Sequence, residues 1–133
     1  MYGCDLSIKA LQAIPKEINT QCCSLLNLTY PAEYFDFVYT AEALEHVINL
    51  DGALAELARV VKPDGALLII DKDIKRSGAI KIEKWEQWFD TRKVASKLTS
   101  LGFTVTIFEN VAYENKQDGL FCAWLAKKNL DHN

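Results

Sequence analysis

Residues 35–47 read FDFVYTAEALEHV, and this stretch decides the fold of the chain. Its first half, Phe35 to Thr40, combines β-branched and aromatic residues, a composition that predicts a buried strand. The strand is followed by an acidic loop and then by residues whose spacing is that of a helix. A strand that leads through a loop into a helix is the building unit of an α/β sheet.

The next segment, residues 50–70, predicts the helix and the second strand of this unit. Apolar residues at helical spacing predict a helix over Leu50 to Val61, with Asn49 or Asp51 as its N-cap. We expect a turn at Lys62–Gly65, because its proline cannot continue a helix and its glycine accepts a positive φ. The run Ala66 to Ile70 is apolar throughout, as in a strand covered on both faces.

Strands and helices are also predicted before residue 35 and after residue 70. The sequence predicts strands over Tyr2 to Asp5, Thr20 to Leu25, Phe103 to Phe108 and Leu120 to Ala126, a helix over Ile8 to Ile14 capped by Ser7, and a helix over Thr91 to Leu101 between an Asp90 or Thr91 cap and Gly102. This order indicates an α/β, doubly wound, mostly parallel sheet with an antiparallel pair of C-terminal strands.

Composition predicts one soluble domain. The chain has 133 residues, of which 50% are hydrophobic and 25% charged, and its net charge is -3. This balance argues against a nucleic-acid partner, and the absence of a long apolar run or a signal peptide argues against a membrane. We expect a cytoplasmic protein with a partial domain over 1–128, a frayed tail over 129–133, and cysteines that pack as small core residues.

From Tyr2 to about Lys127 these motifs resemble a class I S-adenosylmethionine-dependent methyltransferase. The resemblance implies a Rossmann-like fold and methyl transfer. The family opens with a strand and a Gly-x-Gly-x-Gly loop, whereas the six glycines of this chain form no such cluster. We therefore expect an N-terminally truncated domain without the strand between Tyr2 to Asp5 and Phe35 to Thr40. Those two strands then either pair directly or leave exposed edges, which would favour a homodimer.

The resemblance also implies a set of cofactor residues. Ligands of open α/β sheets bind beyond the carboxyl ends of the strands. By resemblance, Asp5 would hold the ribose hydroxyls with Leu6 beside it, although an acid there can also serve as a helix cap. Ser24 and Leu25 would border adenine, with a serine where the family usually carries an acid. Tyr39, Thr40 and Glu42 would line the methionine end.

The sharpest chemical pattern is Glu42-x-x-Glu45-His46. Two methyltransferase groups use a similar pattern to hold a divalent ion, which by its ligands would be Mg²⁺ or Mn²⁺. Many metal-free relatives carry nearly the same residues, and we adopt that interpretation: S-adenosylmethionine as the cofactor and no metal. His46 is the candidate general base, because its ordinary pKa suits proton removal near neutrality.

The acceptor is the least determined part of this interpretation. Trp85 and Trp88 share a helical face and could stack on a substrate or pack a helix on the sheet. We expect methyl transfer to a heteroatom of a small molecule. The alternatives are a non-catalytic remnant that acts as a binding or assembly partner, and a different nucleotide-binding α/β protein.

Overall fold

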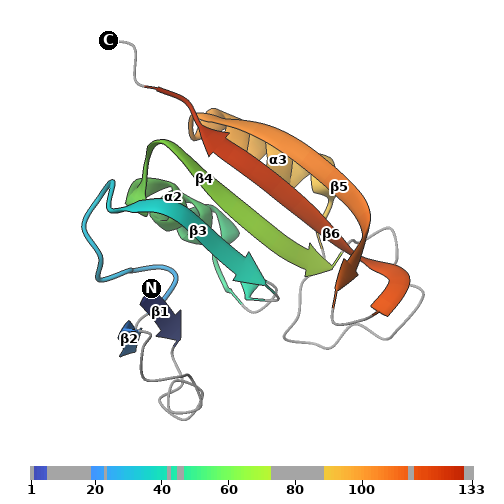
Figure 1. The fold of residues 1–133 in the computed structure, drawn as a ribbon, viewed down its shortest axis with the longest axis horizontal. Helices are drawn as coiled ribbons and strands as arrows, with labels where there is room; N and C mark the ends of the chain where they lie inside the picture. Colours follow the sequence, from blue (N-terminus) through green and yellow to red (C-terminus); the bar gives the residue numbers. More distant parts are fainter. Residues whose placement is uncertain are drawn as a thin grey trace.

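The computed structural model describes residues 2–5, 19–22, 24–41, 43–44, 47–72, 89–113 and 116–130. Along the chain these residues form β1 (Tyr2–Asp5), β2 (Asn19–Cys22), β3 (Phe35–Ala41), α2 (Leu50–Val60), β4 (Val61–Lys72), α3 (Thr91–Ser100), β5 (Phe103–Tyr113) and β6 (Lys116–Lys128) (Figure 1). The predicted helix over Ile8 to Ile14 and the tryptophans Trp85 and Trp88 lie outside the described residues. Neither helix of the described part is long and apolar enough to cross a membrane.

The strands form two sheets. β1 pairs in parallel with β2, and a second sheet has the order β3-β4-β6-β5. In that sheet β3 and β4 are parallel, while β6 runs antiparallel to both β4 and β5. This confirms the Rossmann-like α/β fold with an antiparallel C-terminal pair. Within the described strands β1 does not pair with β3, and β3 lies at the edge of its sheet.

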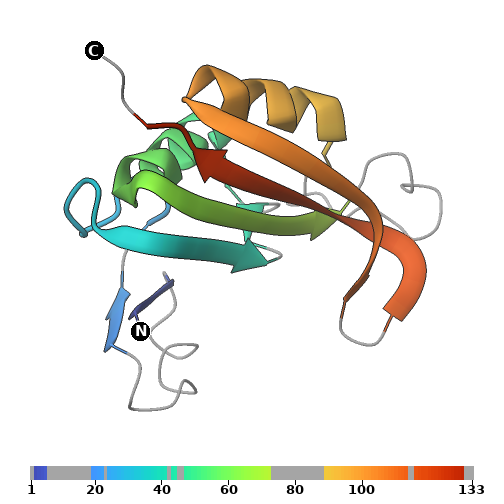
Figure 2. The same cartoon turned by 45° about the horizontal axis from the view of Figure 1, so that its top comes forward.

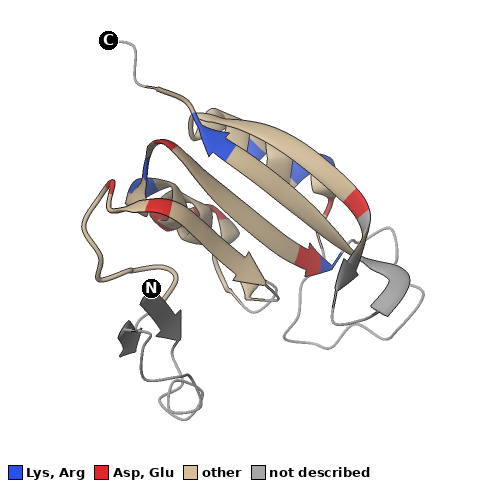
Figure 3. Ribbon diagram, viewed as in Figure 1, with Lys and Arg blue, Asp and Glu red and all other residues tan. Residues whose placement is uncertain are grey.

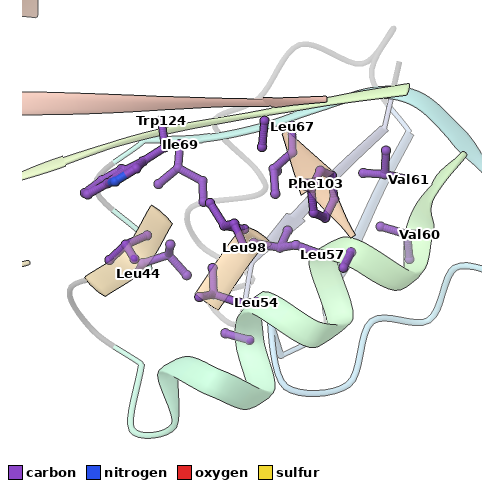
Figure 4. Close-up of a cluster of buried hydrophobic side chains, with 14 of the residues drawn as sticks. Leu44, Leu54, Leu57, Val60, Val61, Leu67, Ile69, Leu98, Phe103 and Trp124 are labelled. Atoms are coloured by element: carbon purple, nitrogen blue, oxygen red, sulfur yellow. The ribbon is translucent and has the colours of Figure 1, made fainter. Parts of the chain in front are cut away.

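Both described helices cover the same face of the four-stranded sheet (Figure 2). Between helices and sheet lies one apolar core, part of which Figure 4 shows. Its largest fully buried side chains include Trp124, Phe103, Leu44, Leu54, Leu67, Ile69 and Leu98. The indole N–H of Trp124 donates to the Thr91 carbonyl oxygen at 2.8 Å, so its one polar group is paired at the start of α3. Trp124 is therefore a core residue.

The opposite face of the sheet, which we call the open face, carries neither of the two described helices. Its side chains are exposed over β3, whereas Phe121 of β6 is buried there against Ile70 and Val111. Phe37 and Tyr39 stack there with ring centroids 6.4 Å apart, and 53% and 63% of their surfaces are exposed. Leu125 of β6 and Phe108 of β5 are also exposed apolar residues. Few charged residues lie along the middle of the strands (Figure 3). Of the predicted strand Ala66 to Ile70, Leu67 and Ile69 are buried on the helix-covered face, whereas Ala66, Leu68 and Ile70 on the open face are only half-buried.

The junction between α2 and β4 differs from the prediction in one respect. Asn49 caps α2 by accepting from the Gly52 N–H at 3.0 Å, and the helix ends at Val60. The Lys62–Gly65 segment already belongs to β4, and the positive φ of 67° falls on Asp64. Gly65 is needed for space instead: a Cβ there would lie 2.8 Å from the Lys62 carbonyl oxygen and 2.9 Å from that of Asp36.

The other boundaries shift by a few residues. The Asp90 carboxylate caps α3 by accepting from Arg92 N–H at 3.0 Å, and Gly102 follows the helix with a φ of 97°. β5 and β6 extend well beyond their predicted ends, since each strand stabilises the other through a long antiparallel ladder. β2 ends at Cys22, earlier than the sequence predicts, because Ser24 begins a turn.

Candidate functional site

The carboxyl ends of the parallel strands place part of the predicted site. Asp5 is the last residue of β1, and Tyr39 and Thr40 lie in the last three residues of β3. Since β3 and β4 are parallel, their carboxyl ends meet at one edge of the sheet. The predicted site residues Leu6, Glu42 and His46 lie outside the described residues.

Tyr39 and Thr40 point to opposite faces of β3, as neighbours on a strand must. Tyr39 presents its ring on the open face. Thr40 is only 8% exposed, and its hydroxyl finds no hydrogen-bond partner among the described residues. A buried hydroxyl without a partner costs about 1–3 kcal/mol, so this is a position where a ligand atom could add a bond.

Ser24 and Leu25 lie in a tight turn. The Asn27 N–H donates to the Ser24 carbonyl oxygen at 3.0 Å, and the Leu26 N–H donates to the Ser24 hydroxyl oxygen at 3.0 Å. The hydroxyl therefore uses one of its two lone pairs inside the turn. Its second lone pair and its O–H remain for other partners. Ser24 and Leu25 are both half-buried at this turn.

Sequence reasoning missed two residues that hold this loop, Glu56 and Arg59. The Glu56 carboxylate accepts from the Leu28 N–H at 2.7 Å, and Arg59 donates to the carbonyl oxygens of Leu28 and Tyr30 at 3.0 and 2.9 Å. Arg59 Nε also lies 2.7 Å from Glu56 Oε1. The hydrogen bond that Arg59 donates to Glu56, assisted by that from the Leu28 N–H, lowers the pKa of Glu56, and the same bond to the Glu56 carboxylate raises the pKa of Arg59. The signal was their spacing of three within one helix, which puts both side chains on one face.

Asp71 is a second residue that the sequence did not single out. The structure buries it completely in β4, two residues past Ile69 on the helix-covered face. Its carboxylate accepts from the Lys72 N–H at 3.0 Å, and its carbonyl oxygen accepts from the buried Cys122 thiol at 3.4 Å. No hydrophobic pattern could reveal it, because Asp71 directly follows the apolar run and is charged.

The residues predicted as possible metal ligands lie outside the described part of the chain. Among the described residues no three His, Cys, Asp or Glu side chains gather as a metal site would require. Glu42, Glu45 and His46, the residues of the predicted pattern, are not described. The metal-free interpretation therefore stays a prediction.

Comparison with known proteins identifies the family and the fold. A family model for the methyltransferase domain matches residues 1–69 of the 133. A SAM-dependent methyltransferase from Archaeoglobus fulgidus superimposes with a TM-score of 0.79 at 14% identity, covering 96% of this chain and 75% of that one. A SAM-dependent methyltransferase from Thermotoga maritima superimposes with a TM-score of 0.78 at 18% identity, covering 96% of this chain and 72% of that one.

A third structure, from Haloferax volcanii, is a complex between the Trm112 methyltransferase activator and a methyltransferase. It superimposes with a TM-score of 0.74 at 14% identity and covers 99% of this chain and 72% of that one. No curated protein matches the sequence. At these identities the structures establish the fold alone, and the family rests on the match over residues 1–69.

Proposed function

The chain belongs to the methyltransferase domain family, and from that premise we propose that it transfers a methyl group from S-adenosylmethionine to a heteroatom of a small-molecule acceptor. One observation carries the proposal. The family match over residues 1–69 spans the whole predicted site, from Asp5 to His46. The position of Tyr39 and Thr40 at the carboxyl end of β3 supports it, because open α/β sheets bind their ligands there.

Each predicted residue has a role in this proposal. Asp5 holds the ribose hydroxyls with Leu6 beside it, and Ser24 and Leu25 border the adenine. The unsatisfied hydroxyl of Thr40, with Tyr39 and Glu42, lines the methionine end. Carboxylate, hydroxyl and backbone groups at these places match the donors and acceptors of the cofactor.

The chemistry is a direct displacement. A lone pair of the acceptor nitrogen or oxygen attacks the methyl carbon, the carbon–sulfur bond breaks, and the sulfonium becomes a thioether. The acceptor then loses a proton, and His46 is the proposed base. In-line positioning of acceptor and methyl group supplies most of the rate in such a reaction, so we expect the His46 contribution to be modest.

Calorimetric titration with S-adenosylhomocysteine tests the proposal. We expect the wild-type chain to bind, and Asp5→Asn to weaken binding by about tenfold or more, since it removes a charged acceptor for two hydroxyls. Asp36→Asn is the control, because Asp36 is an exposed acid of β3 that contacts Lys62 at 3.5 Å. No binding at millimolar ligand would instead favour a non-catalytic assembly partner.

Once binding is established, acceptors can be screened with and without Mg²⁺. Turnover that is unchanged by a chelator supports the metal-free interpretation of the Glu42-x-x-Glu45-His46 pattern. Loss of turnover that only Mg²⁺ or Mn²⁺ restores would show that this pattern holds an ion. The cytoplasmic location expected from composition belongs to the same proposal.

We also propose that two copies of the chain associate through the edge of β3. The support is the open face described above, where Phe37 and Tyr39 stack beside an edge strand. In antiparallel pairing about a two-fold axis at Val38, Phe37 of one copy would lie opposite Tyr39 of the other. Cross-strand aromatic pairs of this kind stabilise sheets.

A further inference from the structure

The side chains of Glu56 and Arg59 in α2 form hydrogen bonds with a loop rather than with another helix or strand. Residues 24–34 connect β2 to β3, and backbone groups of Leu28 and Tyr30 are bound by the Glu56 and Arg59 side chains. The last turn of the helix adds two more bonds: the Arg59 carbonyl oxygen accepts from Glu33 N–H at 2.7 Å, and that of Val60 accepts from Tyr34 N–H at 2.9 Å. This loop is therefore fixed over most of its length.

The Glu56–Arg59 pair suits that task by chemistry and placement. A guanidinium presents a rigid fork of donors, so one side chain reaches two carbonyl oxygens while its Nε still bonds Glu56. The carboxylate in turn accepts from Leu28 and from Arg59 together. An arginine in the last helical turn also interacts favourably with the helix dipole.

Leu28, whose backbone groups bond Glu56 and Arg59, directly follows the Ser24–Asn27 turn. At its other side the turn meets the start of the same helix: a Cβ on Gly52 would lie 3.0 Å from the Leu26 side chain. One helix thus contacts the turn through Gly52 near its N-terminus and fixes the next residue through Glu56 and Arg59 near its C-terminus. The turn has little freedom to move relative to α2.

We infer that Glu56 and Arg59 are positioning residues that hold the Ser24–Asn27 turn in the geometry that reads the adenine ring. The inference rests on the proposed function, since it needs adenine to lie against Ser24 and Leu25. According to this inference, residues of α2 that do not touch the base contribute to the selectivity for adenine by holding the turn that does. A pair that merely stabilised the fold would leave that selectivity unchanged.

The test compares two ligands that differ only at the base. S-inosylhomocysteine replaces the adenine amino group of S-adenosylhomocysteine by a carbonyl and places a proton on the neighbouring ring nitrogen. We expect wild type to prefer the adenine ligand, and Arg59→Gln to reduce the ratio of the two affinities by about fivefold or more, because a displaced turn no longer matches either edge of the base. Arg59→Lys keeps the charge without the fork and should fall in between.

Lys128→Gln is the matched control. Lys128 donates to the carbonyl oxygens of Ala58 and Val61 at 2.8 and 2.7 Å, so it also binds backbone at the end of α2 but does not touch the loop. We expect it to lower the melting temperature while the affinity ratio stays at the wild-type value. Gly52→Ala provides a second route to the loop: its methyl group would lie 3.0 Å from Leu26 Cδ2 and 2.9 Å from Nδ2 of the Asn49 cap, at the opposite end of α2 from the ion pair, and it should also lower the ratio.

The outcomes separate the two proposals. If wild type binds and the ratio is unchanged in Arg59→Gln and Gly52→Ala, the positioning role is wrong while the methyltransferase proposal stands. If wild type binds neither nucleoside, both are wrong. Faster hydrogen exchange of the Leu26 and Asn27 amides in Arg59→Gln, but not in Lys128→Gln, would identify displacement of the turn as the cause of a lowered ratio.

Discussion

The two faces of the four-stranded sheet differ sharply although they share the same strands. On one face Leu67, Ile69 and Trp124 are fully buried under α2 and α3. On the other, Phe37 and Tyr39 remain more than half exposed. Alternation along a strand puts neighbouring residues on opposite sides, so side chains one residue apart experience different environments.

The difference shows where stability and recognition reside in this molecule. Burial of apolar surface stabilises the helix-covered face, which forms one continuous core. Apolar residues on the open face contribute little to folding and remain available for contact. The predictions below test whether this contrast holds in solution.

The largest effect should separate two adjacent leucines of β4. Leu67→Ala empties a fully buried site and should lower the free energy of unfolding by about 3–4 kcal/mol. Leu68→Ala removes a half-buried side chain from the other face and should cost about 1 kcal/mol. Urea unfolding of the two variants measures both values. Equal costs would show that the open face is covered in solution.

A smaller effect is expected where β3 joins β4. Gly65→Ala would place a methyl group within 3 Å of the backbone oxygens of Lys62 and Asp36, so the two strands must separate. We expect a loss of about 2 kcal/mol in the free energy of unfolding. Gly102→Ala, in open space at a φ of 97°, should cost about 1 kcal/mol from backbone strain alone. The reverse order would mean that β3 is only loosely held against the core.

The pair on α2 predicts a pH dependence of stability. Arg59 lowers the pKa of Glu56 below its ordinary value of 4.5, so the stabilisation is present above that value and is lost as pH falls through the lowered pKa. Glu56→Gln should cost about 1 kcal/mol at pH 7, a modest figure because both side chains are partly exposed to solvent. Chemical denaturation at a series of pH values from 7 downward measures this, and the gap between variant and wild type should narrow as the pH falls below 4.5. A gap that does not change with pH would assign the effect to packing.

The smallest stability effect should occur on the open face itself. Phe37→Ser should change the free energy of unfolding by less than about 0.5 kcal/mol, since the side chain is already exposed. If copies associate through β3, the same change should lower the mass measured by sedimentation at a given concentration. Phe108→Ser, an exposed aromatic of the far edge strand β5, is the control and should leave the mass unchanged. A wild-type chain that is monomeric at all concentrations would contradict the association.

Local chemistry was sufficient to predict most element types. The strand at Phe35 to Thr40, the helix from Leu50 and the helix from Thr91 were recognisable because their hydrophobic spacing and caps depend on near neighbours. Asn49 and Asp90 do cap the two helices. Of the candidate site, the sequence located Tyr39 and Thr40 at a strand end, whereas it placed Ser24 and Leu25 in a strand and the structure places them in a turn.

Contacts between distant segments were beyond such reasoning. Arg59 binds carbonyl groups 29 and 31 residues away, and Asp71 is buried beside Cys122, which lies 51 residues further on. A local pattern contains no information about such partners. For the same reason the sequence suggested a positive φ at Gly65. The structure shows instead that a glycine is needed there because a Cβ would collide with the Asp36 carbonyl oxygen of the neighbouring strand.

The sequence by itself determined the family, the alternation of strands and helices and the residues expected at the cofactor, because these follow from spacing and from motifs along the chain. Only the tertiary structure decided that β3 lies at the edge among the described strands of its sheet, that Phe37 and Tyr39 are exposed there and that Glu56 and Arg59 bind backbone groups of Leu28 and Tyr30. Exposure and long-range hydrogen bonds depend on which segments meet in space, and that is a property of the folded chain as a whole.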